Sequence, residues 1–313
     1  FSVYDYAGIE TGHASNFFNL PWQGLGCANL GPQAVSAHFN ECRWYYELLR
    51  DWRGKFRHHE DPNHNEPNKY WDSTGARLLF FCLPRKNIYL TGKGGYIANE
   101  INQTEINTII DSGRHAGLYH TLSDQELLSR VKNWCHATRF RASQELAKRE
   151  GDWAKEAIGM LGRDSMDQKY GGTRLLEAIG SRAAPAVPLL TKHLEHPDLW
   201  LRIRSSLALQ AIGPAARVAV PTLLKAITSS EGTLYQHMYH RALALTLFQT
   251  DKGLIYLPED FSFFPKHKII EVLRILLKNK EAESVSCLQH PLRLLDFDDL
   301  KTLWPDIVKK IEH

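Results

Sequence analysis

The residues best suited to chemistry lie in an aromatic-rich stretch near the start of the chain. His38, Glu41 and Tyr45 recur at helical spacing and therefore share one face of a predicted helix. A second predicted helix begins near Trp71 and Asp72. Aromatic walls with a few convergent polar groups are typical of a ligand-binding cleft. The candidate binding residues are His13, His38, Glu41, Arg43, Trp44, Trp71 and Asp72.

Two of these residues are candidates for catalysis, with Asp72 or His38 acting as acid or base. The alternative is that Asp72 caps its helix, that His38 is a hydrogen-bonded buried imidazole, and that the rings form a core. The distinguishing observation is whether Asp72 and His38 approach each other in an enclosed cavity. No Ser-His-Asp or Cys-His nucleophile arrangement can be singled out from the sequence.

A second acidic motif lies near the end of the chain. Asp296-Phe297-Asp298-Asp299 fits the D-x-D-D pattern of the proton-donating acid in some terpene cyclases, where a carboxylic acid is kept protonated beside a cavity of aromatic rings. The same acidic residues immediately precede Leu300, Leu303 and Ile307, which have helical spacing. Acidic side chains stabilise a helix N-terminus, and the sequence favours this interpretation.

Metal and cofactor sites are not predicted. The segment 57–66 holds His58, His59 and His64 with three carboxylates, which are suitable metal ligands in kind. Their spacing matches no established motif, and Pro62 and two asparagines favour a solvated loop. Thr91-Gly92-Lys93-Gly94-Gly95 lacks the spacing of a phosphate-binding loop and is predicted to be a turn.

Composition excludes several classes of protein. The 313 residues are 43% hydrophobic and 23% charged, as in a globular chain with a core. The net charge of +3 shows no one-sided basic face, so we expect no nucleic-acid partner. The longest apolar run, 78–84, is far shorter than the roughly 20 residues of a membrane span, so no span is expected. Five widely spaced cysteines indicate neither a disulfide framework nor a zinc finger.

The chain changes character near residue 96. Of its 33 aromatic residues, 18 lie in residues 1–96. Farther on, Ala178-Ile179-Gly180 recurs 33 residues later as Ala211-Ile212-Gly213, and Ala186-Val187-Pro188 recurs at the same offset as Ala219-Val220-Pro221. This period is typical of stacked helix pairs of the HEAT or armadillo kind. The predicted division is a helical segment over 1–96, a connector over 97–122 and an α-solenoid with C-terminal capping helices over 123–313.

The repeat predicts local structure. Pro185 and Pro188 suit the first turn of a helix, where a missing N–H costs nothing, and Gly180 and Gly213 suit helix ends, where glycine adopts a left-handed cap. Ser123-Asp124-Gln125-Glu126 is a capping-box pattern that begins the array. Leu207 and Ile212 are predicted to be almost fully buried on the inner face of their helix. A helix pair cannot bury its apolar faces alone, so neighbouring pairs must stack.

The early motifs carry a resemblance to a family. The motifs are Gly12-His13, Asn16-Phe17-Phe18, Gly31-Pro32-Gln33-Ala34-Val35, Ala37-His38-Phe39, Glu41-Cys42-Arg43-Trp44-Tyr45-Tyr46, Trp71-Asp72-Ser73-Thr74-Gly75-Ala76 and Leu90-Thr91-Gly92-Lys93-Gly94. Followed by helical repeats, they resemble an uncharacterised bacterial family of large proteins. In that family an α/α-toroid domain, like those of terpene cyclases and protein prenyltransferases, leads into HEAT repeats. The resemblance implies an all-α fold and an extracytoplasmic location, periplasmic or secreted, but no activity.

Two hypotheses about function follow. The first is a non-catalytic binding or scaffold module, whose solenoid offers a surface to a protein partner and whose aromatic cleft takes a small ligand or peptide. The second is an enzyme of toroid type, a lyase, cyclase or glycan-acting hydrolase, which uses Asp72 or His38. Only the likeness of fold supports the second hypothesis.

Overall fold

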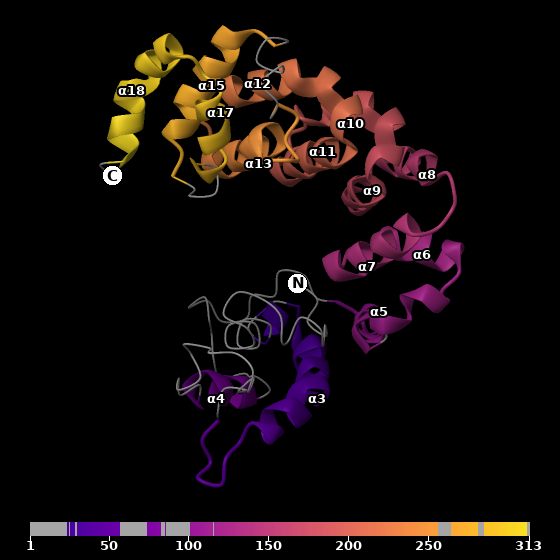
Figure 1. Cartoon of the computed structure of the whole chain (residues 1–313). Coiled ribbons are helices and arrows are strands. Elements are labelled where there is room, and N and C mark those ends of the chain that lie inside the picture. The colour runs from indigo at the N-terminus through magenta and orange to yellow at the C-terminus, as the bar shows by residue number, and fades with distance from the viewer. Residues whose placement is uncertain are drawn as a thin grey trace. The chain divides into compact units, whose positions relative to one another are not determined.

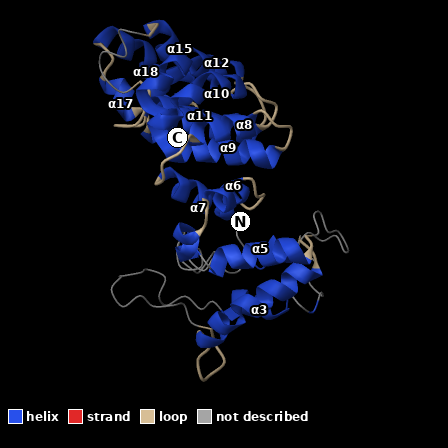
Figure 2. Cartoon of the chain, turned by 90° about the vertical axis from the view of Figure 1, so that its right-hand side faces the viewer, coloured by secondary structure: helices blue, strands red, loops and turns tan. Residues whose placement is uncertain are grey.

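The computed structural model describes residues 24, 26–28, 30–56, 74–82, 85, 101–114, 116–255, 264–280 and 285–311. Within these residues the chain is helical and has no strand, apart from an isolated antiparallel bridge between Arg50 and Phe56 (Figure 2). The prediction of an all-α chain is confirmed for this part of the protein. The chain divides into two compact units, one comprising Phe1–Leu122 with Trp134–Arg141, the other Ser123–Asn133 with Ala142–His313.

The first unit contains α3 (Pro32–Leu48). Gly31-Pro32 predicts the start of this helix correctly, but the helix ends at Leu48, before the end that the sequence predicts at Gly54. Gly31 has a φ of 101° and Pro32 follows at the first helical position, where its missing N–H costs no hydrogen bond. After α3 the chain turns at Gly54, whose φ is 81°, and the Phe56 N–H donates to Thr74 Oγ1 at 3.1 Å. Thr74 begins α4 (Thr74–Cys82), so this hydrogen bond ties the turn to the second helix.

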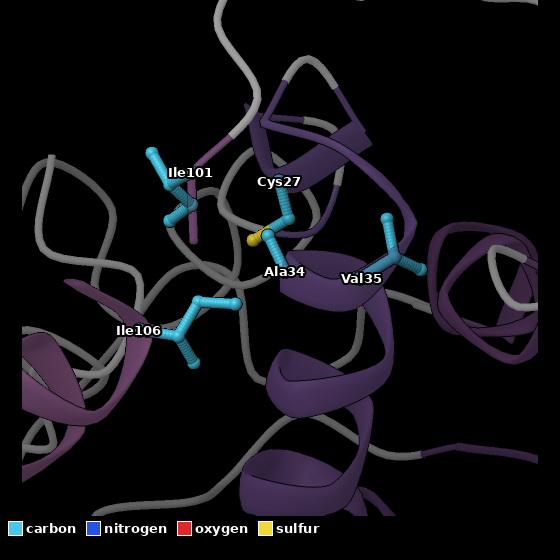
Figure 3. Close-up of a cluster of buried hydrophobic side chains, with 5 residues drawn as sticks. All are labelled: Cys27, Ala34, Val35, Ile101 and Ile106. Atoms are coloured by element: carbon cyan, nitrogen blue, oxygen red, sulfur yellow. The ribbon is translucent and has the colours of Figure 1, made fainter. Parts of the chain in front are cut away.

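A small core joins α3 to the helix that follows the predicted 1–96 segment, α5 (Gln103–Arg114). Its buried side chains are Cys27, Ala34, Val35, Ile101 and Ile106. Figure 3 shows Cys27 and Ala34 close together, with Ile101 and Ile106 arriving from the chain before α5 and from α5 itself. The segment 97–122, predicted as a connector, therefore contributes side chains to a core. It also contains the 3₁₀ helix η2 (Ala116–Thr121).

The second unit contains the repeat. α7 (His136–Ala147) passes from the first unit into the second. The other helices, coloured from magenta to yellow in Figure 1, are α6 (Asp124–Val131), α8 (Trp153–Leu161), α9 (Met166–Ile179), η3 (Gly180–Ala186), α10 (Val187–His193), α11 (Leu199–Ile212), η4 (Gly213–Ala219), α12 (Val220–Ser229), α13 (Gln236–Phe248), α15 (Lys266–Leu277), α17 (Gln289–Arg293) and α18 (Phe297–Ile311).

The helices of the second unit pack in two series. α11 packs between α9 and α13, while α12 packs on α13 and α15, and α15 packs on α18. The 3₁₀ helices η3 and η4, which precede α10 and α12, also contact each other. Leucines at the centre of these contacts, among them Leu175, Leu209 and Leu243, are fully buried. Burial of such apolar surface is the main stabilising term of this unit.

Local signals of the repeat are confirmed. Ser123 and Glu126 form the predicted capping box, in which the Glu126 N–H donates to Ser123 Oγ at 3.3 Å and the Ser123 N–H donates to Glu126 Oε2 at 2.8 Å. Gly180 and Gly213 end equivalent helices with φ of 58° and 76°. Their ψ values of −128° and −136° lie outside the left-handed helical region, in one that only glycine adopts readily.

One burial prediction is wrong. Ile212 is 1% exposed, as expected, but Leu207 is only half-buried. Leu207 lies seven residues after Trp200 and four before Ala211, and both of these residues are exposed. Positions at this helical spacing share a face, so Leu207 lies on the open face of α11 rather than in its core.

One stretch of the described chain, Leu199–Ser229, is long and apolar enough to cross a membrane by length and composition alone. This stretch contains two α-helices, α11 and α12, separated by the η4 turn that Gly213 begins. α11 packs on α9 and α13, and α12 packs on α13 and α15. The apolar composition is therefore used in helix packing within this unit.

Candidate functional site

A pocket of about 530 Å³ lies in the second unit, where the C-terminal ends of α9 and α11 meet the turn that follows α13. Its floor and walls come mainly from apolar side chains and glycine backbone. The lining residues are Glu177, Leu207, Gln210, Ala211, Gly213, Pro214, Arg217, Asp251, Lys252, Gly253 and Leu254. A concave site with a mostly apolar lining and a few polar groups is typical of ligand pockets.

Glu177, the acidic residue that α9 contributes to the pocket, forms ion pairs with two arginines. Arg174 Nη1 donates to Glu177 Oε2 at 2.7 Å, and Arg204 Nη1 of the neighbouring helix α11 lies 3.8 Å from the same oxygen. Burial lowers the pKa of Arg204, while the Glu177 carboxylate opposes this shift. The two guanidinium groups therefore neutralise the charge of Glu177 with one positive charge to spare, and they hold its side chain across the α9–α11 boundary.

The opposite wall is a turn held by hydrogen bonds. The Gly253 N–H donates to the Gln249 carbonyl at 2.7 Å, and the Leu254 N–H donates to the Thr246 carbonyl at 2.9 Å. A side chain at position 253 would overlap the Leu247 carbonyl, so only glycine fits there. Gln210 Nε2 then joins this turn to α11 by donating to the Leu245 carbonyl and to Gln249 Oε1, both at 2.8 Å.

Sequence reasoning missed this pocket, although a signal for it exists. Glu177 and Gln210 lie 33 residues apart, immediately before the repeated Ala-Ile-Gly triplets. Both residues line the pocket, so successive repeats contribute the same position to one site. The signal is a polar residue that directly precedes the Ala-Ile-Gly triplet in both repeats. The contribution of the turn 251–254 depends on how α13 packs and has no equivalent local signal.

The structure describes four of the seven residues predicted to bind a ligand, all of them on α3. His38 is fully buried, with Nδ1 3.7 Å from Cys42 Sγ. Burial and, to a lesser extent, the Glu41 carboxylate raise the pKa of Cys42 to about 12. A thiol with this pKa is protonated at neutral pH, so the His38–Cys42 pair is not an activated nucleophile.

The other described candidates are more exposed than His38. Glu41 is half-buried, while Arg43 is exposed and pairs with Glu47 at 3.4 Å. Trp44 is 51% exposed and meets the Tyr45 ring edge to face, with the ring centres 5.7 Å apart. α3 thus places His38 on its buried face, and Arg43 and Trp44 on its exposed face.

The buried face of α3 packs against α4 through rings. Phe81 of α4 lies 5.7 Å from the Phe39 ring and 6.2 Å from the Tyr46 ring, measured between ring centres. Arg77, which the sequence analysis did not single out, is buried with its guanidinium 5.5 Å from the centre of the Tyr46 ring. A cation over an aromatic face stabilises such a cluster.

Several predicted residues lie outside the described part of the chain. They are His13, Trp71 and Asp72 of the candidate cleft, His58, His59 and His64 of the polar loop, and the turn at 91–95. The approach of Asp72 to His38 and the ligand-binding cleft therefore remain predictions. Among the residues that the structure describes, no group of three or more His, Cys, Asp or Glu side chains is placed to hold a metal ion.

The D-x-D-D motif begins α18. The Asp299 N–H donates to Asp296 Oδ1 at 2.9 Å, as expected for a residue that caps a helix N-terminus. Lys266 Nζ lies 2.5 Å from Asp296 Oδ2 and also pairs with Asp299. The hydrogen bond from Lys266 lowers the pKa of Asp296 to about 2. Asp296 is therefore ionised at neutral pH, the opposite of a proton-donating acid.

In its described part the chain is helical, and two successive copies of the 33-residue repeat contribute residues to one pocket. Residues 1–92 are similar to a family described as "Domain of unknown function (DUF6288)". Searches of curated proteins and of solved structures each found no match. The family match includes α3 and α4, while the pocket lies outside it.

Proposed function

We propose that the protein is a non-catalytic binding module, in which a toroid-like helical segment leads into a HEAT-like α-solenoid that takes a protein partner. The 33-residue repeat, the equivalent glycine stops and the order α9–α11–α13 support the solenoid. The predicted motifs of residues 1–96 and their helices α3 and α4 support the toroid-like segment.

The observation that carries the proposal is the pocket between repeats. It has the size of a ligand site, and two of its polar side chains, Glu177 and Gln210, are held by internal hydrogen bonds and ion pairs. Glu177 is paired with arginines, and the amide nitrogen of Gln210 already donates twice. These are the features of a preorganised recognition surface, which loses little entropy when a partner docks.

A library of random peptides displayed on phage, selected on the whole chain, tests this proposal. We expect enriched peptides to bind the wild-type chain and to lose at least tenfold affinity for Ala211→Arg, because a long side chain would fill the pocket. Ala211 is exposed and arginine is a good helix former, so this variant should fold.

The control is Gly159→Arg, which adds the same side chain to an exposed position of α8 where a Cβ meets nothing within 4 Å. This variant should bind the peptides as the wild type does. Circular dichroism checks that both variants keep their helix content. The proposal is wrong if no peptide is enriched, or if the enriched peptides bind Ala211→Arg and Gly159→Arg equally well.

A further inference from the structure

One side of α18 carries a row of apolar side chains that its own unit leaves uncovered. Phe297, Trp304 and Ile311 are 78%, 60% and 78% exposed, and seven residues separate each of them from the next. Seven residues are about two helical turns, so these three side chains share one side of the helix, called here the α18 stripe. Single exposed apolar residues are common, whereas a contiguous apolar row is typical of an interaction surface.

A different side of α18 holds the helix to its own unit. Leu303 is fully buried, and α18 packs on α15 (Figure 1). Arg274 Nε of α15 donates to Asp306 Oδ2 at 3.1 Å, and Lys310 Nζ donates to the Asn279 carbonyl at 2.7 Å. Spacings of three and four residues put Leu303, Asp306 and Lys310 on one side of the helix. α18 is therefore fixed in place by this side while it presents the α18 stripe on another.

The charges of α18 are placed so that two copies of the helix complement each other. Asp298 lies six residues before Trp304 and Lys309 five residues after it, and both charged side chains are exposed. Within the part of the chain that the structure describes, neither forms an ion pair. Eleven residues are about three turns, so Asp298 and Lys309 project from the same side of the helix. In an antiparallel pair with a twofold axis at Trp304, Asp298 of each copy therefore lies beside Lys309 of the other.

The apolar side chains fit the same antiparallel arrangement. Phe297 and Ile311 are equally far from Trp304 along the chain, so each Phe297 meets Ile311 of the other copy and the two Trp304 rings meet at the axis. A twofold interface uses the same patch on both copies and must be self-complementary in this way. With its flanks, the pair would bury roughly 1,000 Å², which is at the low end for a specific interface and is consistent with micromolar affinity.

We propose that this protein forms a homodimer in which two copies of α18 pack antiparallel through the α18 stripe. A second copy is favoured over an unrelated apolar helix because it supplies both the matching apolar spacing and the opposite charges. This inference goes beyond the proposed binding function and does not depend on it, since no residue of α18 lines the pocket.

Sedimentation equilibrium of the whole chain, at concentrations from about 1 to about 100 µM around the expected dissociation constant, tests the dimer. We expect the wild type to dimerise and Trp304→Gln to dimerise at least tenfold more weakly, because a tryptophan at the centre of an interface is a typical hot spot. The matched control is Trp200→Gln, which removes a similarly exposed tryptophan from α11 and should leave the dimer unchanged. Circular dichroism checks that both variants keep their helix content.

Two charge variants test the antiparallel arrangement. Asp298→Lys and Lys309→Asp should each weaken the dimer several-fold, because either change places two pairs of like charges at the interface. An equimolar mixture of the two variants should dimerise about as tightly as the wild type, since every contact of the mixed dimer again joins opposite charges. In a parallel dimer the single variants would cause no loss, because like charges already face each other there.

Three results would overturn the proposal. They are a wild type that stays monomeric over this range, equal dimerisation of Trp304→Gln and Trp200→Gln, and a mixture of the charge variants that dimerises no better than either variant alone. The proposed binding function is judged separately, because Trp304→Gln should bind the selected peptides as the wild type does and Ala211→Arg should still dimerise.

Discussion

Gly171 of α9 lies where two helices come closest, and its substitution gives a sharp test of the second unit. A Cβ at this position would overlap the carbonyl oxygen of Val131, at the end of α6, and would lie 3.2 Å from Val131 Cγ1. The overlap is with backbone, which cannot rotate away as a long side chain can. Gly171→Ala therefore forces α6 and α9 apart.

The expected change in the free energy of unfolding of Gly171→Ala follows from two opposed effects. Alanine in a helix interior gains about 1 kcal/mol over glycine. Overpacking typically costs roughly 1–3 kcal/mol, and backbone overlap favours the upper part of this range. We expect Gly171→Ala to lower the free energy of unfolding by about 1–2 kcal/mol. The control is Gly159→Ala on α8, where a Cβ meets nothing within 4 Å, and this change should raise stability by about 0.5–1 kcal/mol.

Urea denaturation followed by circular dichroism measures both changes, and hydrogen exchange of peptides from α6 and α9 locates them. The free energy of unfolding should fall in Gly171→Ala and rise in Gly159→Ala. Hydrogen exchange in α6 and α9 should become faster only in Gly171→Ala. If both variants are stabilised, the close approach of α6 to α9 is refuted, because propensity alone would then explain the data.

Two further predictions concern polar contacts of the same unit. Asp198 Oδ1 accepts from the Leu201 N–H at 2.7 Å and from the Tyr170 hydroxyl at 2.8 Å. Asp198→Ala should lower the free energy of unfolding by about 1–2 kcal/mol, and Tyr170→Phe by about 0.5–1.5 kcal/mol, in urea titrations. A negligible loss in both variants would contradict the role of Asp198 as the N-cap of α11. Burial, aided by His237, lowers the pKa of His240 from 6.5, while the Ile227 backbone and Glu231 oppose it. The unfolded chain then binds the proton more readily, so the free energy of unfolding should fall as pH drops below 6.5, and should fall less in His240→Gln. If the wild type and His240→Gln lose stability in parallel as pH drops, His240 is not the group responsible.

The local elements of the second unit could be predicted because their signals lie within a few residues. The capping box at Ser123 and the helix stops at Gly180 and Gly213 depend on hydrogen bonds and φ angles of adjacent residues. Pro188 lies in the first turn of α10, as expected. Pro185 instead lies inside the 3₁₀ helix η3, because the chain tightens between Gly180 and Val187 before the α-helix begins.

The candidate cleft near the start of the chain was harder to predict for a physical reason. Helical spacing gives the angle between side chains around α3, but it does not say which angle faces the core. His38 faces inward beside Cys42, and Trp44 faces outward. That choice depends on where α4 and the Phe56 turn pack, which is information from tertiary structure. Whether Trp71 and Asp72 complete a cleft beside this face stays a prediction.

The repeat itself explains why Leu207 is not buried. The residue 33 positions earlier is Arg174, which is half-buried and pairs with Glu177. A position that holds a half-buried arginine in one repeat is one that the helix packing leaves open, so leucine at the same position in the next repeat lies at the pocket instead of in the core. Comparison between repeats thus distinguishes a core leucine from one that lines the pocket, whereas periodicity within one helix does not. By the same comparison Ile179 and Ile212, which are both buried, are core positions, and Glu177 and Gln210 are positions of the pocket. The positions that differ between repeats and remain open, Glu177 with Gln210 and Arg174 with Leu207, are therefore the ones at which the proposed binding function should be tested.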